Sequence, residues 1–239
     1  GIVWDSECET EQDECRTKTR ILDTYVPPFS LPETLLWSPV AHYALLDRHV
    51  ARLVESAEYF DTPLDTAALR KRLHAFAGDL PARPHKVRLL VAPNGTLSLE
   101  AEPITPFSES APRPVALARE PVDSSDPFLY HKTTHRRVYE KALAARPGFA
   151  DVILFNAKGE VTESTRANVL AEIGGALCTP PVSCGLLPGT GRAELLANGT
   201  VTERVITLDD LLHSPRIFLV NSVRGIVPVA VTAGGEGTE

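Results

Sequence analysis

Residues 86–104 read KVRLLVAPNGTLSLEAEPI, and this stretch decides which kind of fold the first half of the chain adopts. Two runs rich in Val and Leu flank Asn94-Gly95, and an Asn-Gly pair in that setting is a strong short-range signal for a β-hairpin. Upstream, residues 47–60 carry apolar side chains at helical spacing, with Asp47 as the expected N-cap, and residues 65–78 repeat the pattern. The first half is therefore predicted to combine helices with antiparallel strands.

The second half begins after a proline-rich stretch. Residues 105–127 carry four prolines between Pro106 and Pro121 and show no clear period, which predicts a connection between domains. Beyond it we expect a helix at 132–146, strands at 151–155, 161–173 and 216–231, and a glycine turn entering a helix at 187–199. The predicted fold is α+β, with a small mixed α/β domain at 26–106, a linker at 107–126 and a larger strand-rich domain at 127–239.

Composition limits the classes of partner. The chain has 239 residues, a hydrophobic fraction of 43% and a formal net charge of -7, and it contains no apolar run near the roughly 18 residues that span a bilayer. The negative charge disfavours nucleic acid and leaves small anionic ligands, held by a local basic patch, as the better fit. The cysteines have neither the spacing of a metal site nor the density of a disulfide scaffold, and we expect free thiols in the cytoplasm and no metal. They are Cys8, Cys15, Cys178 and Cys184.

One of the six lysines has surroundings that suit covalent chemistry. A lysine that forms a Schiff base must lose its proton, which requires a partly desolvated site, often near other cations. Lys132 stands in LYHKTTHRRVYE, between histidines and hydroxyl residues and just before two arginines. Four of the others are expected in water or within regular elements, namely Lys71, Lys86, Lys141 and Lys158. Lys18 and Lys132 remain as candidates, and a solvated basic face is the alternative for Lys132.

Two further features suit a phosphate and a ring nitrogen. In LPGTGR, the backbone N–H groups of Thr190 and Gly191 can point at an anion, aided by the positive end of the following helix. Arg52 could hold the same phosphate. Glu163 is a carboxylate in an otherwise strand-like segment and needs a partner, such as a protonated pyridine nitrogen. The alternatives are a loop that requires positive φ for the glycine turn and a solvated arginine for Arg52.

Five motifs together resemble a known family. RHVARL, KTTHRR, VTESTRANVL, LLPGTGR and NSVRGIVPV, in this order, are similar to the fold type IV pyridoxal-phosphate (PLP) enzymes, which include branched-chain and D-amino-acid aminotransferases and aminodeoxychorismate lyase. The resemblance covers about residues 28–230 and implies a cofactor held between two domains. It implies that Lys132 is the covalent anchor and proton shuttle and that Glu163 pairs with the pyridine nitrogen. The phosphate would be held by Arg52, the backbone around Leu187, Thr190 and Gly191, and Ser222.

The first residues resemble a different enzyme. GIVWDSECETEQDECRTKTRIL, residues 1–22, is similar to the final motif of the chorismate-binding synthases, component I. Glu11, Glu14 and Lys18 match residues of their chorismate and magnesium site, but the rest of that site is missing and no synthase activity is expected. Residues 1–25 are interpreted as the remnant of an upstream synthase domain in a fusion protein, with an ordinary charged amphipathic helix as the alternative.

These resemblances together predict a reaction. LPETLLW is similar to the substrate-side segment of the lyases and would place Thr34 in the active site, while Arg224, and less strongly Arg88, could meet a substrate carboxylate. We therefore expect a cytoplasmic, homodimeric lyase that converts 4-amino-4-deoxychorismate to 4-aminobenzoate and pyruvate in folate synthesis. A transaminase of branched-chain or D-amino acids and a degenerate assembly domain are the alternatives. His135 and the LPGTGR turn depart from the usual lyase pattern.

Overall fold

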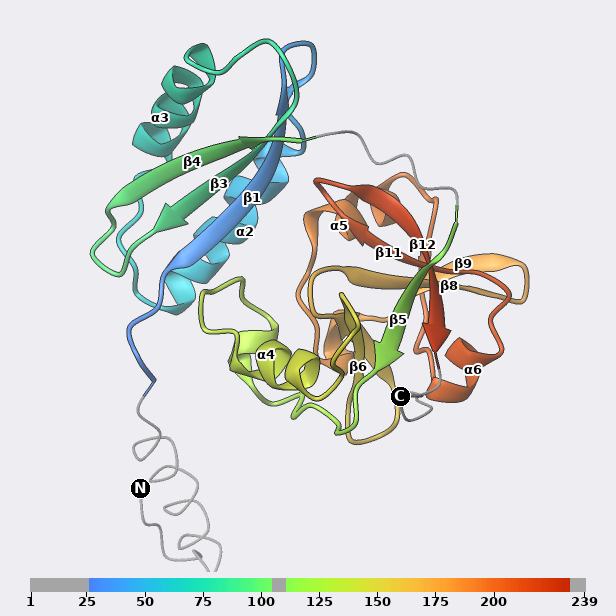
Figure 1. The fold of residues 1–239 in the computed structure, drawn as a ribbon. Helices are drawn as coiled ribbons and strands as arrows, with labels where there is room; N and C mark the ends of the chain where they lie inside the picture. Colours follow the sequence, from blue (N-terminus) through green and yellow to red (C-terminus); the bar gives the residue numbers. More distant parts are fainter. Residues whose placement is uncertain (1–25, 105–110, 233–239) are drawn as a thin grey trace, which may run out of the picture.

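The structure of the protein is a computed structural model that describes residues 26–104 and 111–232 (Figure 1). The expected synthase remnant at 1–25 lies outside the described residues. With it lie the residues that match the chorismate site and two of the cysteines: Glu11, Glu14, Lys18, Cys8 and Cys15. The described part forms two bodies, a helix-covered sheet and a larger strand-rich domain, in agreement with the predicted α+β fold.

The smaller body is a four-stranded antiparallel sheet in the order β2-β1-β3-β4. Its strands are β1 (Leu31–Ser38), β2 (His42–Tyr43), β3 (His85–Val91) and β4 (Leu97–Pro103). The predicted hairpin is confirmed, because β3 and β4 pair from Val91 opposite Leu97 and Gly95 supplies the left-handed φ of 81° in their turn. Helices α2 (Leu46–Tyr59) and α3 (Thr66–Gly78) pack on one face of this sheet.

Both predicted helices are present, but one cap was misassigned. Asp65 caps α3, where its carboxylate accepts from the N–H groups of Ala67 and Ala68. Asp47 as the N-cap of α2 is wrong, since the cap position is Leu45, two residues earlier and in a left-handed conformation with φ of 52°, and Asp47 lies in the first turn. The chain enters α2 from the short strand β2, and that tight reversal fixes the start of the helix.

The larger body is an eight-stranded sheet in the order β10-β9-β8-β11-β12-β5-β6-β7. An additional pairing of β7 with β8 joins the sheet back on itself into a barrel around a core of Val and Ile side chains. The strands are β5 (Arg113–Leu117), β6 (Val152–Phe155), β7 (Val161–Ser164), β8 (Asn168–Ile173), β9 (Ala176–Thr179), β10 (Thr202–Glu203), β11 (Ile217–Asn221) and β12 (Gly225–Thr232).

Two segments differ from expectation. The segment 107–126, expected to be a linker, contains β5, which is buried at Val115 and Ala116 and pairs in parallel with both β12 and β6. The helix expected at 132–146 is shorter, because α4 spans only Arg137–Ala144. Lys132 therefore lies in a loop, which follows the 3-10 helix η1 (Pro127–Leu129).

The remaining helices are short. The predicted glycine turn and helix are confirmed by α5 (Thr190–Ala197), which follows the 3-10 helix η2 (Val182–Cys184). The last helix is α6 (Leu208–Leu212), which carries a capping box. Across residues 26–104 and 111–232, every helix is too short or too polar to cross a membrane.

Candidate active site

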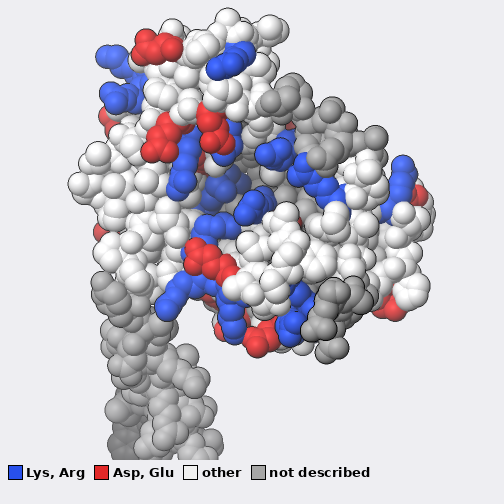
Figure 2. Space-filling model, in the orientation of Figure 1, with Lys and Arg blue, Asp and Glu red and all other residues white. Residues whose placement is uncertain are grey.

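A hollow of about 430 Å³ opens between the small sheet and the barrel. Its wall on the small-sheet side is the face of β1 and β3 that carries Thr34, Lys86 and Arg88. The barrel contributes residues of β7, the start of α5 and the turn between β11 and β12. Figure 2 shows that Lys and Arg side chains gather in and around this hollow. A volume of this size suits a small organic ligand.

The loop that carries Lys132 is fixed to the small domain on both sides of the lysine. Ser30 and Thr134 exchange two hydrogen bonds of 2.9 Å, and the His131 ring lies 3.1 Å from the Ser56 hydroxyl. The Thr133 hydroxyl also accepts from the N–H of His135, a local bond that competes with helix formation in this loop. Burial, together with the nearby Arg52 guanidinium, lowers the pKa of Lys132 to about 8. The structure therefore gives Lys132 the eased deprotonation that covalent chemistry requires.

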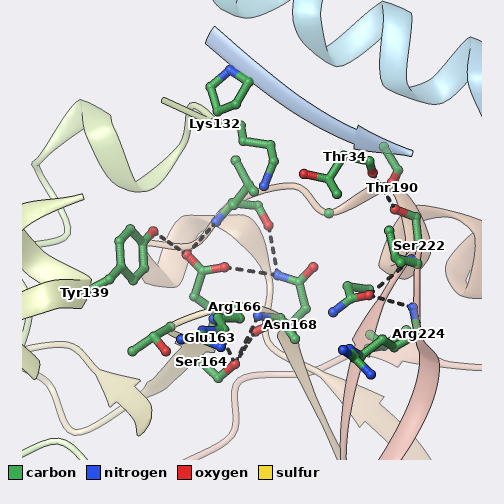
Figure 3. Close-up of a pocket in the computed structure, with 18 of the residues that line it drawn as sticks. Thr34, Lys132, Tyr139, Glu163, Ser164, Arg166, Asn168, Thr190, Ser222 and Arg224 are labelled. Atoms are coloured by element: carbon green, nitrogen blue, oxygen red, sulfur yellow. Dashed lines mark hydrogen bonds between the residues drawn. The ribbon is translucent and has the colours of Figure 1, made fainter. Parts of the chain in front are cut away.

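Glu163 enters the same space from the barrel wall (Figure 3). It sits on β7 with only 4% of its surface exposed, and its hydrogen-bond donors in the described part of the chain are neutral: the Tyr139 hydroxyl at 2.6 Å, the Leu187 N–H at 3.2 Å and the Asn168 amide at 3.4 Å. Burial raises the pKa of Glu163 to about 7 against the opposing effect of these donors. A cation placed against this carboxylate would keep it ionised.

A second buried carboxylate, Glu33, organises the other side of the hollow. Arg52 donates to both of its oxygens, through Nε at 2.9 Å and Nη2 at 2.6 Å, and His49 Nδ1 lies 2.7 Å from the same carboxylate. The other nitrogen of His49, Nε2, lies 3.2 Å from the Thr190 hydroxyl. Arg52 also donates to the Pro188 carbonyl, so three of its five N–H groups are engaged and two remain for a ligand.

The first turn of α5 closes this side of the hollow. Gly189 and Gly191 leave it without side chains, and a Cβ on Gly191 would lie 3.0 Å from the backbone carbon of Asn221. The first N–H groups of a helix have no partner within the helix, so those of Thr190 and Gly191 can serve an anion. Ser222 lies beside them and donates to the Thr34 carbonyl at 3.4 Å. Leu187 differs from the expected role, since its N–H donates to Glu163.

The two arginines expected to meet a carboxylate both line the hollow. Arg88 stands opposite Thr34 in the pairing of β3 with β1, and Arg224 lies in the turn between β11 and β12. That turn is held by Asn221, whose side-chain oxygen accepts from the N–H groups of Val223 and Arg224. Sequence reasoning had placed Lys86 only as the start of a strand, yet it also lines the hollow, paired with Glu102.

The structure thus brings every expected site residue to one hollow or its wall, and it adds others that sequence reasoning missed. The additions are Glu33, His49, Lys86, Arg136, Tyr139, Arg166 and Asn168. A signal for Glu33 was present, because strand alternation puts it on the same face as Leu31 and Leu35, where an acid is out of place. Among the described residues, no group of three or more His, Cys, Asp or Glu side chains could hold a metal ion.

Comparison with known proteins gives concordant matches. The family model for class IV amino-transferases matches residues 30–231. A putative aminodeoxychorismate lyase of Schizosaccharomyces pombe is 31% identical over 192 residues, which is 76% of this chain and 81% of that protein. A solved putative amino-acid aminotransferase from Mesorhizobium loti is 35% identical with a TM-score of 0.79, covering 85% of this chain and all of the other. The 4-amino-4-deoxychorismate lyase of Pseudomonas aeruginosa is 27% identical with a TM-score of 0.71, covering 84% and 82%.

Proposed function

The chain belongs to the class IV aminotransferase family, and from this premise we propose that it is a lyase that converts 4-amino-4-deoxychorismate to 4-aminobenzoate and pyruvate. Enzymes of this family depend on PLP. The observation that carries the choice of reaction is the charge of the hollow, which is lined by many cationic side chains. Two observations support a chorismate-derived substrate: the S. pombe and P. aeruginosa relatives bear the name of such a lyase, and residues 1–22 resemble chorismate-binding enzymes.

The residues of the hollow fit PLP. Lys132, with its lowered pKa, suits a covalent link to the aldehyde, and Glu163 suits a protonated pyridine nitrogen because its other partners are neutral. The glycine-bounded first turn of α5, with Thr190 and Ser222, suits a phosphate, and the remaining N–H groups of Arg52 can reach it. When bound there, PLP supplies an electron sink for charge released at the substrate carbon.

The substrate wall favours a dianion. Besides Arg52 and Lys132, the hollow is lined by five cationic side chains, namely Lys86, Arg88, Arg136, Arg166 and Arg224, whereas Glu163 is the one acid among the described lining residues. 4-Amino-4-deoxychorismate carries two carboxylates, and each can form charge-assisted hydrogen bonds with a guanidinium or ammonium group. A branched-chain amino acid carries one carboxylate and an apolar side chain, so it would leave more of these cations without an anionic partner.

In the proposed reaction, each step uses a residue of this chain. Arg88 and Arg224 bind the carboxylates and orient the ring, while Thr34 contacts the departing enolpyruvyl group. Lys132 takes the proton from the carbon that carries the amino group. The bond between the ring and the enolpyruvyl oxygen then breaks, the ring becomes aromatic, and the departing enolate becomes pyruvate by taking up the proton that Lys132 holds. Glu163 stays ionised beside the pyridine nitrogen of the cofactor throughout, and it accepts hydrogen bonds from the Tyr139 hydroxyl and the Leu187 N–H.

A transaminase is the second candidate, and the 35% identity to the M. loti aminotransferase is the observation that favours it. The two reactions differ in one requirement. A lyase regenerates its starting form in each cycle, whereas a transaminase retains the amino group and stops until a keto-acid acceptor arrives. The charge of the hollow favours the lyase.

The decisive assay supplies 4-amino-4-deoxychorismate without any keto acid and follows 4-aminobenzoate and pyruvate. Sustained release of both products in equal amounts is expected. Absence of product, together with amino transfer from leucine or D-alanine, would instead establish the transaminase. Arg224→Ala should lower the rate at which both products form. Arg119→Ala, outside the hollow, serves as the matched control.

The proposal also covers the setting of the enzyme. We expect a cytoplasmic homodimer that acts beside an upstream synthase domain, so that the aminodeoxychorismate made by one domain is consumed by the next. Light scattering of the purified chain would test the dimer. The catalytic proposal does not depend on that result.

A further inference from the structure

The least expected feature of the site is a buried polar chain on the side of the small domain. Glu33 and His49 are 1% and 2% exposed, yet they occupy positions on β1 and α2 whose neighbours form an apolar core. The hydrogen bonds link Arg52 to Glu33, Glu33 to His49, and His49 to the Thr190 hydroxyl. Buried polar groups are costly unless fully paired, so a buried hydrogen-bond network that ends at a ligand pocket has a role there.

The protonation pattern along this chain follows from its hydrogen bonds. Burial alone would raise the pKa of Glu33, but the Arg52 guanidinium and the His49 hydrogen bond outweigh it and lower the pKa to about 2. The Glu33 carboxylate is therefore ionised and can only accept hydrogen bonds. Because His49 Nδ1 lies 2.7 Å from it, Nδ1 must carry a hydrogen. The state of the other nitrogen, Nε2, then decides what Thr190 can do.

Two states of His49 give Thr190 opposite properties. If His49 is neutral, Nε2 accepts, the Thr190 hydroxyl donates to it, and only oxygen lone pairs face an anion in the pocket. If His49 is cationic, Nε2 donates to Thr190, and the hydroxyl hydrogen becomes free to donate to the anion. The cation also adds a positive charge next to the first turn of α5.

We infer that Glu33 and His49 are positioning residues for the cofactor phosphate, which selects the arrangement in which His49 Nε2 donates to Thr190 and the Thr190 hydroxyl donates to the phosphate. The inference rests on the PLP site proposed above, but not on whether that site serves a lyase or a transaminase. Removing the His49 imidazole or the Thr190 hydroxyl should therefore weaken phosphate binding and leave the covalent link to Lys132 in place.

The charged groups around His49 could also affect phosphate binding. Glu33 faces it from β1, Thr190 from α5, and Arg52 lies one helical turn along α2. Arg48 and Glu194 form a partly exposed ion pair across α2 and α5 at 2.8 Å, and Lys132 lies close enough to Arg52 and Glu33 for their charges to affect its pKa. Among these groups, Lys132 is the one that would disturb a simple measurement, because it also binds the cofactor.

A comparison of PLP with pyridoxal removes that disturbance. Both compounds link to Lys132, but only PLP carries the phosphate, so the ratio of their dissociation constants reports the phosphate cradle alone. The ratio is read from the absorbance of the full chain during titration with each compound and needs no activity. The ionisation of the phosphate itself affects native and variant chains alike, so it cancels in their comparison.

At neutral pH the native chain should prefer PLP strongly over pyridoxal. His49→Gln removes the imidazole that orients Thr190, and its preference for PLP should be about tenfold lower than the native value. The control His213→Gln changes an exposed histidine at the C-terminal end of α6 and should keep the native preference. Equal preferences in the native chain and His49→Gln would overturn the proposal.

Thr190→Val provides an independent test that leaves the Glu33–His49 pair in place. It removes the hydroxyl at nearly constant volume, so the preference for PLP should fall about tenfold. If Thr190→Val keeps the native preference, the proposal is wrong, even where His49→Gln fails to fold. A native chain that binds PLP and pyridoxal equally well would overturn the phosphate cradle itself, whereas the product assay would still report on the reaction.

Discussion

Each half of the molecule buries one carboxylate at the hollow, and the two behave in opposite ways. In the small domain, Glu33 is held by Arg52 and His49, and its pKa is lowered to about 2. In the barrel, Glu163 has only neutral donors, and burial raises its pKa to about 7. Their exposure is nearly equal, at 1% and 4%, so burial alone does not explain the contrast. The opposite pKa shifts therefore follow from the hydrogen-bond partners, which include a guanidinium for Glu33 and only neutral donors for Glu163.

The contrast separates a charge that is paired within the folded chain from one that is not. Arg52, the cation that pairs with Glu33, comes from the protein itself, so that pair is complete when the chain folds. Glu163 lacks such a partner among its hydrogen-bond donors, and its carboxylate is fully charged at neutral pH only when a cation arrives. This is the reason why we propose Glu163 as the partner of the ring nitrogen of the cofactor. Mutations can test the two carboxylates against each other.

The largest effect is expected at Lys132, because the charges of Glu33 and Glu163 both affect its pKa. Lys132→Ala removes the proposed covalent anchor and proton carrier, and turnover should fall by about 10⁴-fold. Borohydride reduction of the PLP-loaded native chain, followed by peptide mapping, should label Lys132. Lys141→Ala is the control, since Lys141 is exposed and pairs with Glu120 at the surface. Label on Lys86 or Lys141 would contradict the assignment.

Glu33→Gln should cost about 3 to 5 kcal/mol of unfolding free energy, because it removes the anion from a buried pair and leaves the charge of Arg52 uncompensated. Urea unfolding of the cofactor-free chain at neutral pH measures this. A loss below about 1 kcal/mol would show that the pair is not a structural charge. Glu120→Gln, the same change in an exposed ion pair, should be nearly neutral.

Glu163→Gln is the matched change in the other half and should show the reverse pattern. Turnover should fall on the order of 10²-fold, because the ring nitrogen loses its counter-charge. The cofactor-free chain should lose no stability at neutral pH, because the amide replaces a buried carboxylate whose hydrogen-bond donors are neutral. The covalent link to Lys132 should still form, which absorbance can follow. Full activity in Glu163→Gln would refute the electrostatic role of Glu163.

The same contrast predicts two opposite pH dependences in the cofactor-free chain. The pKa of Glu163 rises on folding from its usual 4.5 to about 7, so the folded state binds the proton more tightly and stability should decline as pH rises through this window, by about 3 kcal/mol. The pKa of Glu33 falls on folding from 4.5 to about 2, so its contribution is lost as pH falls through that lower window. Unfolding curves measured from pH 4 to 8 should show that the native chain loses stability as pH rises and that Glu163→Gln does not.

Sequence reasoning found one of these carboxylates and missed the other for a physical reason. Glu163 lies in a motif that its family shares, and an acid in a strand-like run is conspicuous. Glu33 also breaks a strand pattern, but its partners His49 and Arg52 lie on a helix 16 and 19 residues away, and only the packing of α2 on β1 brings them together. Local periodicity reveals a misplaced charge but not the group that compensates it.

The same limit applies to the fold. The two helices and the Asn-Gly hairpin of the small domain depend on local signals and were predicted correctly. Barrel closure depends on pairing between β7 and β8 and on β5 joining strands far along the chain, and no local pattern encodes either. The prolines before β5 made a central strand resemble a linker. Lys132 was found despite a misplaced helix, because its identification relied on residue type and motif order.

The smallest effect should come from Tyr139, whose hydroxyl donates to Glu163 at 2.6 Å and whose ring lies under the Arg136 guanidinium at 4.5 Å. Tyr139→Phe removes the hydroxyl but keeps the ring and its contact with Arg136. The hydrogen bond lowers the pKa of Glu163, so its loss should raise that pKa further and shift the stability decline to higher pH, with a cost of about 1 kcal/mol. Turnover should fall only a few-fold, because a cation at the ring nitrogen stabilises the carboxylate more strongly than one neutral donor does. Unfolding curves at several pH values measure the shift. A loss of activity as large as that of Glu163→Gln would mean that Tyr139 contacts the cofactor or substrate directly, and that Glu163 is not the sole polar group serving the ring.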